Sequence, residues 1–158
     1  MANGASQYCG LPNLTAGPVL LPSATFAVAG TTFGTIVSGN NVSPSLGEFQ
    51  SAAFLLDVTA AATLVGDTLD VSIQTTFDAV PTDGGLWFDI VHFAQVLGNG
   101  GAKRWVDKIA TNLAQVEFER GTALAASSVR HIFGDAYRVK IAVVGTGSFT
   151  FSVSSNWK

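Results

Sequence analysis

The sequence predicts an all-β fold: an antiparallel β-sandwich, or jelly-roll-like barrel, of about eight strands with an extended N-terminal arm. Three observations support this prediction. Apolar and polar residues alternate with a period of two over most of the chain after residue 23. Gly, Asn, Asp and Pro separate the alternating stretches, where short turns need them. The length of 158 residues suits a single domain around one core.

Residues 1–23 form the predicted arm, and residues 24–158 form the predicted sandwich domain. The arm contains Pro12, Pro18 and Pro22, three of the five prolines, and has no regular period. Apolar side chains recur along it, whereas disordered linkers are depleted in them. We therefore expect the arm to pack on protein, either on its own domain or on a neighbouring subunit. The candidate contact residues are Tyr8, Leu11, Leu14, Val19, Leu20 and Leu21.

Eight segments after the arm are expected to be strands. Alternation is clearest where Leu69, Val71 and Ile73 face one way and the polar residues between them face the other. The predicted strands are residues 24–29, 33–38, 47–59, 68–77, 86–96, 113–120, 136–144 and 148–154.

Two stretches do not follow the period of two. Residues 121–134 could be a short helix or a loop that crosses between strands, and residues 102–112 are also ambiguous. By contrast, the Gly145-Thr146-Gly147 turn between the last two strands predicts a β-hairpin.

The composition favours a protein that contacts other proteins. Only 12% of the residues are charged, against about 25% in typical soluble domains, and a charge-poor surface often lies partly against partners. The net charge of −3 argues against nucleic acid, which requires clustered Lys and Arg. The one local basic concentration, Lys103, Arg104 and Lys108, is expected to be a solvated loop face.

The sequence gives no sign of export or of a membrane partner. Cys9 is the only cysteine, so no intrachain disulfide is possible. The first eight residues lack the basic start and apolar run of a signal peptide, and no stretch reaches about 18 uninterrupted apolar residues. We expect the chain to be made in the cytoplasm.

No catalytic constellation emerges, so we expect the protein not to be an enzyme. His92 lies among apolar strand residues and is expected to be structural, and His131 is expected to be a surface residue. No serine stands in a Gly-x-Ser-x-Gly elbow. Glu117 and Glu119 would lie about 7 Å apart on one strand face, but the intervening Phe118 marks the other face as core. Both acids then face solvent.

Cofactor and metal sites are likewise not expected. The glycines between Gly98 and Gly101 match neither phosphate-loop spacing and suit a flexible turn. No zinc or EF-hand spacing occurs. Loop carboxylates could hold calcium only in an unfamiliar arrangement, and the candidates are Asp67, Asp70, Asp78 and Asp83.

The three tryptophans leave a binding function open. Trp105 or Trp157 could stack on sugars, which would make the chain a carbohydrate-binding module. Trp87 lies in a dense apolar strand and is expected in the core. Trp157 is the penultimate residue, and the apolar area of its side chain favours docking on its own domain or on a partner.

The succession of strands resembles small structural proteins of tailed bacteriophages, some of which are capsid decoration (cement) proteins. The segments that carry the resemblance are LLDVT at 55–59, LDVSIQT at 69–75, WFDI at 87–90, YRVK at 137–140 and SFTFSV at 148–153. The resemblance implies a non-enzymatic virion protein that sits on the capsid surface, commonly as a trimer, and clamps the major capsid protein. It also implies that a terminal arm reaches an adjacent subunit. Head-completion and tail proteins fit the same pattern.

Overall fold

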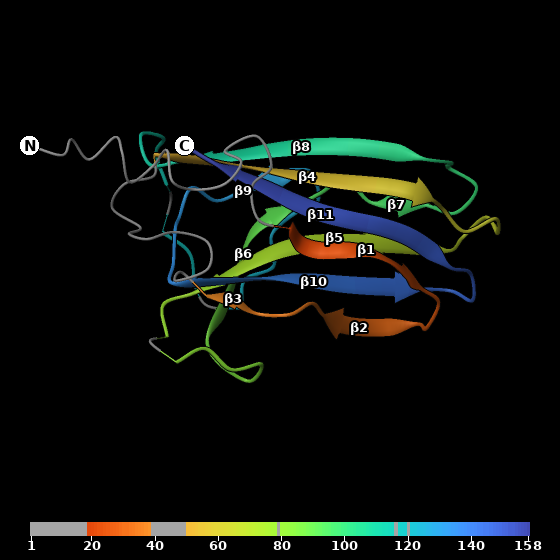
Figure 1. Cartoon of the computed structure of the whole chain (residues 1–158), viewed down its shortest axis with the longest axis horizontal. Helices are drawn as coiled ribbons and strands as arrows, with labels where there is room; N and C mark the ends of the chain where they lie inside the picture. The colour runs from red at the N-terminus through yellow and green to blue at the C-terminus, as the bar shows by residue number, and fades with distance from the viewer. Residues whose placement is uncertain (1–18, 39–49, 79, 116, 120) are drawn as a thin grey trace, which may run out of the picture.

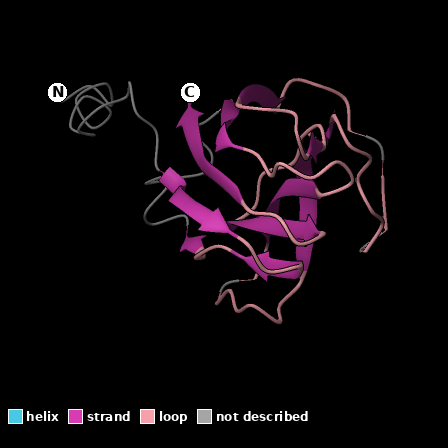
Figure 2. Ribbon diagram, turned by 90° about the vertical axis from the view of Figure 1, so that its right-hand side faces the viewer, coloured by secondary structure: helices cyan, strands magenta, loops and turns pink. Residues whose placement is uncertain are grey.

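The computed structural model describes residues 19–38, 50–78, 80–115, 117–119 and 121–158, and every regular element among them is a strand (Figures 1 and 2). None of these residues belongs to a helix that could cross a membrane. The strands are β1 (Val19–Phe26), β2 (Gly30–Phe33), β3 (Val37–Ser38), β4 (Ser51–Ala60), β5 (Thr68–Thr76), β6 (Trp87–His92), β7 (Val96–Leu97), β8 (Lys103–Ala110), β9 (Ser128–Val129), β10 (Ala136–Val144) and β11 (Phe149–Trp157).

The strands form two antiparallel sheets. The smaller sheet has the order β1-β11-β4-β8, and the larger one has the order β2-β10-β5-β6-β9, with β3 beside β10 and β7 beside β5. One hydrophobic core cluster draws side chains from both sheets, as in a β-sandwich. The predicted all-β sandwich is therefore confirmed.

Alternation along the strands explains which side chains form the core. In β4 every second residue from Ala52 to Val58 is fully buried, and in β11 Phe149, Phe151 and Val153 are fully buried. In β5 the inner residues Leu69 and Ile73 are also fully buried. These side chains fill the space between the two sheets.

The strand predictions differ in accuracy along the chain. β10 has the predicted bounds, and β5 ends one residue earlier than predicted. The predicted strand 113–120 is wrong for its described residues, which lie in a loop, whereas the ambiguous residues 102–112 contain β8. The segment 121–134 is a crossing loop that includes β9 rather than a helix.

The predicted boundary between arm and domain lies inside a strand. β1 begins at Val19 and pairs with β11, so residues 19–23 belong to the sandwich. Pro22 coincides with the irregular register of β1, which is the edge strand of the smaller sheet. The residues before Val19 lie outside the described part of the chain.

The β10–β11 turn is confirmed and has a feature that the sequence does not reveal. The carboxylate of Asp67 lies against Gly145 and Gly147, where a side-chain carbon would collide with it. Asp67 is only 6% exposed, and its Oδ1 accepts a hydrogen bond from the Thr146 amide (3.2 Å). Its Oδ2 has no hydrogen-bond partner among the residues that the structure describes. The turn therefore needs glycine on both sides of Thr146.

Candidate functional site

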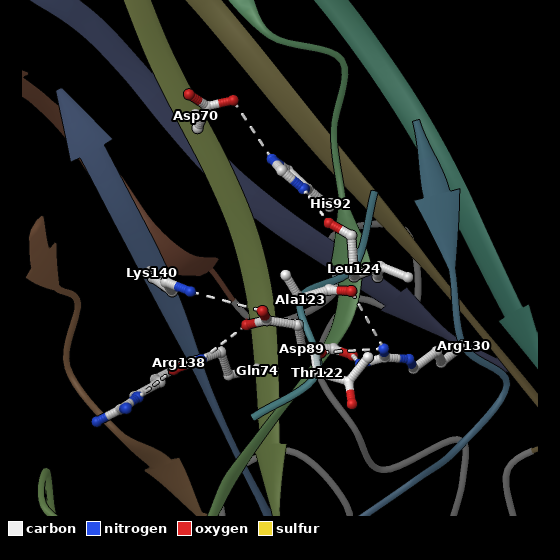
Figure 3. Close-up of polar contacts among 10 residues, drawn as sticks. All are labelled: Asp70, Gln74, Asp89, His92, Thr122, Ala123, Leu124, Arg130, Arg138 and Lys140. Atoms are coloured by element: carbon white, nitrogen blue, oxygen red, sulfur yellow. Dashed lines mark hydrogen bonds and ion pairs between the residues drawn. The ribbon is translucent and has the colours of Figure 1, made fainter. Parts of the chain in front are cut away.

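A cluster of polar side chains lies on the outer face of the larger sheet, where β10, β5 and β6 run side by side (Figure 3). Strand register places Gln74 between Arg138 and Asp89. The Gln74 carbonyl accepts from Arg138 Nε (2.8 Å), and its amide donates to Asp89 Oδ1 (2.7 Å). Lys140 Nζ lies 3.5 Å from Asp89 Oδ2. One amide thus links a cation to a carboxylate.

Arg138 is the most buried cation of this cluster, at 4% exposure. Its guanidinium lies between the rings of Phe33 and Trp87, at 3.9 and 4.1 Å from their centroids. It also donates to the Asp83 carbonyl (2.9 Å). Burial lowers the pKa of Arg138, and the nearby carboxylates of Asp83 and Asp89 oppose that shift.

Arg130 fastens the long crossing loop to the same face. Its NH1 donates to the Asp89 carbonyl (3.0 Å), and its NH2 donates to the Thr122 carbonyl (3.0 Å). Its guanidinium lies 4.0 Å from the centroid of the Phe118 ring. Burial lowers the pKa of Arg130 as well. The loop therefore covers polar residues that the alternation alone would assign to solvent.

The two histidines also hold loops in place. His92 Nδ1 lies 2.6 Å from the Leu124 carbonyl, and its Nε2 lies 3.4 Å from Asp70 Oδ1. Because a carbonyl only accepts, Nδ1 carries the proton of that bond. His131 Nδ1 accepts from the Ala110 amide at the end of β8 (3.2 Å). His92 lies in a strand with both ring nitrogens close to polar partners, as expected, and His131 is half-buried.

A cavity of about 110 Å³ lies within the polar cluster. It combines charged side chains with an aromatic wall, in which the rings of Phe88 and Phe118 meet edge to face at 6.0 Å. Its lining residues are Gln74, Trp87, Phe88, Asp89, Phe118, Gly121, Thr122, Arg130 and Lys140.

A second hollow is an open groove of about 480 Å³ beside the edge strand β8. Lys103 and Arg104 line it, so these basic residues lie on a strand and not on the expected loop face. Arg104 donates to Asp57 Oδ1 (2.8 Å), and this bond raises the pKa of Arg104. The groove is shallow and exposed, and one of its two cations, Arg104, is already paired with Asp57.

The candidate calcium ligands do not come together. Asp67 lies in the β4–β5 loop and accepts from the Thr146 amide, and Asp70 accepts from Gln95 (2.9 Å). Asp78 accepts from the Leu86 amide, and Asp83 lies 3.6 Å from Arg138. Within the described part of the chain, no three or more carboxylate, histidine or cysteine side chains are grouped around a common point.

The predicted contact residues lie in different environments. Leu20, Leu21 and Trp157 are buried in the core of their own chain, and the Trp157 ring packs against Tyr137 at 4.8 Å. Val19 is 55% exposed. Tyr8, Leu11 and Leu14 lie outside the described residues. Neither Trp87 nor Trp157 offers the surface platform that sugar stacking needs, and Trp105 is half-buried against the core.

The turns after β1, β4, β7 and β10 lie at one end of the sandwich, the right-hand end in Figure 1. Several apolar side chains in or beside these turns are exposed. Val144 and Leu97 flank Thr68 on neighbouring strands, and Gly98 packs against the Leu64 carbonyl. We call this the loop-tip patch, and its members are Val28, Leu64, Val65, Leu97 and Val144. Exposed apolar patches commonly mark protein contacts.

Sequence reasoning missed the polar cluster and the loop-tip patch. The polar cluster had one signal in the sequence: Gln74, Arg138 and Lys140 lie on the polar sides of strands with clear alternation. The sequence does not show that these residues contact one another, because that contact depends on the pairing of β5 with β10. Arg130 could not be found either, because it lies in a loop whose residues do not alternate.

Comparisons with known proteins found little that resembles this chain. No protein-family model matches the chain, and no curated protein matches it. Among solved structures, a cryo-EM structure of Broad Bean Stain Virus is similar at 11% identity with a TM-score of 0.35. The alignment covers 70% of this chain and 55% of that one, so the match spans about half the length of the viral chain.

Proposed function

We propose that this chain is a non-enzymatic virion structural protein that binds the outer surface of a phage capsid and stabilises it. Its partner in this proposal is the major capsid protein, and it acts as a homotrimer located in the virion. The resemblance of its strands to phage structural proteins supports this role. The observation that carries it is the loop-tip patch.

The loop-tip patch suits a protein contact because its side chains are exposed at one end of a well-packed sandwich. Val28 is 78% exposed and Val65 is 86% exposed. Covering such apolar area stabilises a complex by about 25 cal/mol per Å² before the costs of association. A rigid scaffold loses little conformational freedom when its loops dock, which favours binding to a regular shell.

The arm is the second proposed contact element. It joins the sandwich at Val19, at the start of the edge strand β1. Eighteen extended residues reach about 60 Å, which is enough to touch an adjacent subunit. In this proposal Tyr8, Leu11 and Leu14 fill grooves on that neighbour or add a strand to it.

Many weak contacts to a repeating lattice produce firm attachment. A trimer that engages three equivalent sites gains avidity because the second and third contacts form intramolecularly. Stabilisation of the shell then follows from linkage, since a ligand that binds only the intact capsid raises its resistance to disruption.

Co-sedimentation with capsids that lack this chain tests the proposal. The full chain should bind saturably, and Val28→Asp with Val65→Asp should weaken binding at least tenfold because charge is placed in an apolar contact. Val80→Asp is the matched control, because Val80 is 80% exposed but lies outside the loop-tip patch. Equal binding of both variants, or no binding by the full chain, would contradict the proposal.

A further inference from the structure

The 110 Å³ cavity on the outer face of the larger sheet has an excess of positive charge. Arg130 and Lys140 line it, and Asp89 is the one carboxylate among its described lining residues. Arg138, which donates to Gln74, and its partner Asp83 add one charge of each sign nearby. The described lining residues therefore carry a net charge of about +1 in a chain whose net charge is −3.

Asp89 is already engaged by protein groups. Its Oδ1 accepts from Gln74 at 2.7 Å, and its Oδ2 faces Lys140 at 3.5 Å. The Asp89 side chain is only 13% exposed, so it is largely shielded from water. This one carboxylate therefore faces two lining cations, Lys140 and Arg130.

Lys140 is the lining cation with donor capacity to spare. Within the described part of the chain its one polar contact is with Asp89, at 3.5 Å. This distance is long for a charge-assisted hydrogen bond, which typically spans about 2.7–2.9 Å. An ammonium has three donors, and the Lys140 side chain is 35% exposed. Arg130, by contrast, directs both terminal nitrogens at backbone carbonyls.

The remaining walls favour a small ligand with a charged end. Phe88 and Phe118 supply apolar surface, which lowers the local dielectric and strengthens attraction between unlike charges. A volume of 110 Å³ corresponds to about four water molecules at roughly 30 Å³ each. This volume admits a carboxylate with one or two attached carbons, but it is small for a sugar ring.

We propose that this cavity binds a carboxylate group, held by the ammonium of Lys140 in the positive potential of Arg130. The group can belong to a free small carboxylic acid or to an acidic side chain or C-terminus of another protein. This site is separate from the loop-tip patch and does not depend on the proposed capsid role.

Titration of the full chain followed by two-dimensional ¹H–¹⁵N NMR tests the proposal. Sodium acetate at constant ionic strength should shift two signals saturably: the Gly121 amide, which lines the cavity, and the Trp87 indole N–H, which donates to the Thr82 carbonyl (2.8 Å). Lys140→Gln should weaken the apparent affinity about fivefold or more. Lys108→Gln, on the edge strand β8 of the other sheet, should leave it unchanged.

Titrations with further compounds define which molecules can supply the carboxylate. A peptide with a free C-terminal carboxylate, compared with its amidated form, tests whether a protein terminus can supply the group. Shifts that do not saturate, or equal acetate affinity in a folded Lys140→Gln variant, would overturn the proposal. Saturation by inorganic phosphate but not by acetate would also overturn it, since the site would then not be one for carboxylates. Thermal unfolding of each variant verifies that it is folded.

Discussion

Arg138 connects four parts of the larger sheet through one buried guanidinium. It contacts Phe33 of β2, Gln74 of β5, Trp87 of β6 and the Asp83 carbonyl in the loop before β6. A buried cation is costly unless its donors are paired. Here the pairing comes from a neutral amide, a carbonyl, two aromatic faces and the Asp83 carboxylate at 3.6 Å. The residue therefore serves to hold loops against the sheet.

Replacing Arg138 with Met should lower the free energy of unfolding by about 2–3 kcal/mol, because the Gln74 and Asp83 oxygens lose their donor and the ring contacts lose the cation. Urea unfolding followed by tryptophan fluorescence measures the change. Arg104→Met is the control, since the Arg104 side chain is 72% exposed, and its unfolding midpoint should hardly move. Equal effects of the two substitutions would contradict the role given to Arg138.

Asp107 offers a test by pH. Burial raises the pKa of this carboxyl, so the folded chain holds its proton to a higher pH than the unfolded chain does. The protonated carboxyl is therefore tolerated at low pH. Folding stability is lost as pH rises from the pKa of Asp107 in the unfolded chain, about 3.9, through its higher pKa in the folded chain. Asp107→Asn should raise the melting temperature at pH 7, and the gain should shrink below about pH 4. Thermal unfolding between about pH 3 and pH 7 measures this change in melting temperature. Glu117→Gln is the control, because Glu117 is exposed. A lower melting temperature of Asp107→Asn than of the unsubstituted chain at pH 7 would contradict a destabilising Asp107 carboxylate.

At the scale of elements, the β10–β11 hairpin depends on a residue that is remote in sequence. A side chain at Gly147 would meet the Asp67 carboxylate and the Ala62 methyl group. The glycines of the turn predicted a hairpin here. They did not predict the contact with Asp67, which follows from the position of the β4–β5 loop.

Gly147→Ala should cost about 2 kcal/mol of stability, because the new methyl group overpacks a closed site. Adding Asp67→Ala should recover part of this loss, and a double-mutant cycle measured by urea unfolding gives the interaction energy. Gly84→Ala is the control, since a side-chain carbon there meets nothing within 4 Å. Strict additivity of the Gly147 and Asp67 substitutions would show that they do not interact.

The strands that the sequence predicted well are those with one buried and one polar side. β10 and β5 have this pattern because their inner residues, such as Val139 and Ile73, face the core. β8 was missed because its edge position leaves Val106 exposed and puts Asp107 toward the inner side. Residues 113–120 alternate as well, but Phe118 there packs from a loop onto the sheet. Alternation of residue types indicates that one side of a segment is buried. It does not distinguish a strand from a loop that packs against the sheet.

At the scale of the whole molecule, we expect that the arm can be removed without unfolding the sandwich, provided that the deletion ends before Val19. Deleting residues 1–18 should leave the urea unfolding midpoint nearly unchanged, whereas deleting residues 1–22 should cost about 2–5 kcal/mol because Leu20 and Leu21 leave the core. Equal stability of the two truncations would contradict the placement of β1 in the sandwich. The shorter deletion is therefore the one to use when the arm is tested for binding, where we expect weaker attachment to capsids with an intact fold.

The capsid-surface role is tested most directly by cryo-EM of virions compared with matched particles that lack this chain. We expect extra density on the outer surface of the capsid, in copies related by local three-fold symmetry. That density should fit the sandwich with its loop-tip patch against the major capsid protein. Density confined to the neck or tail, or no difference between the two particles, would contradict it.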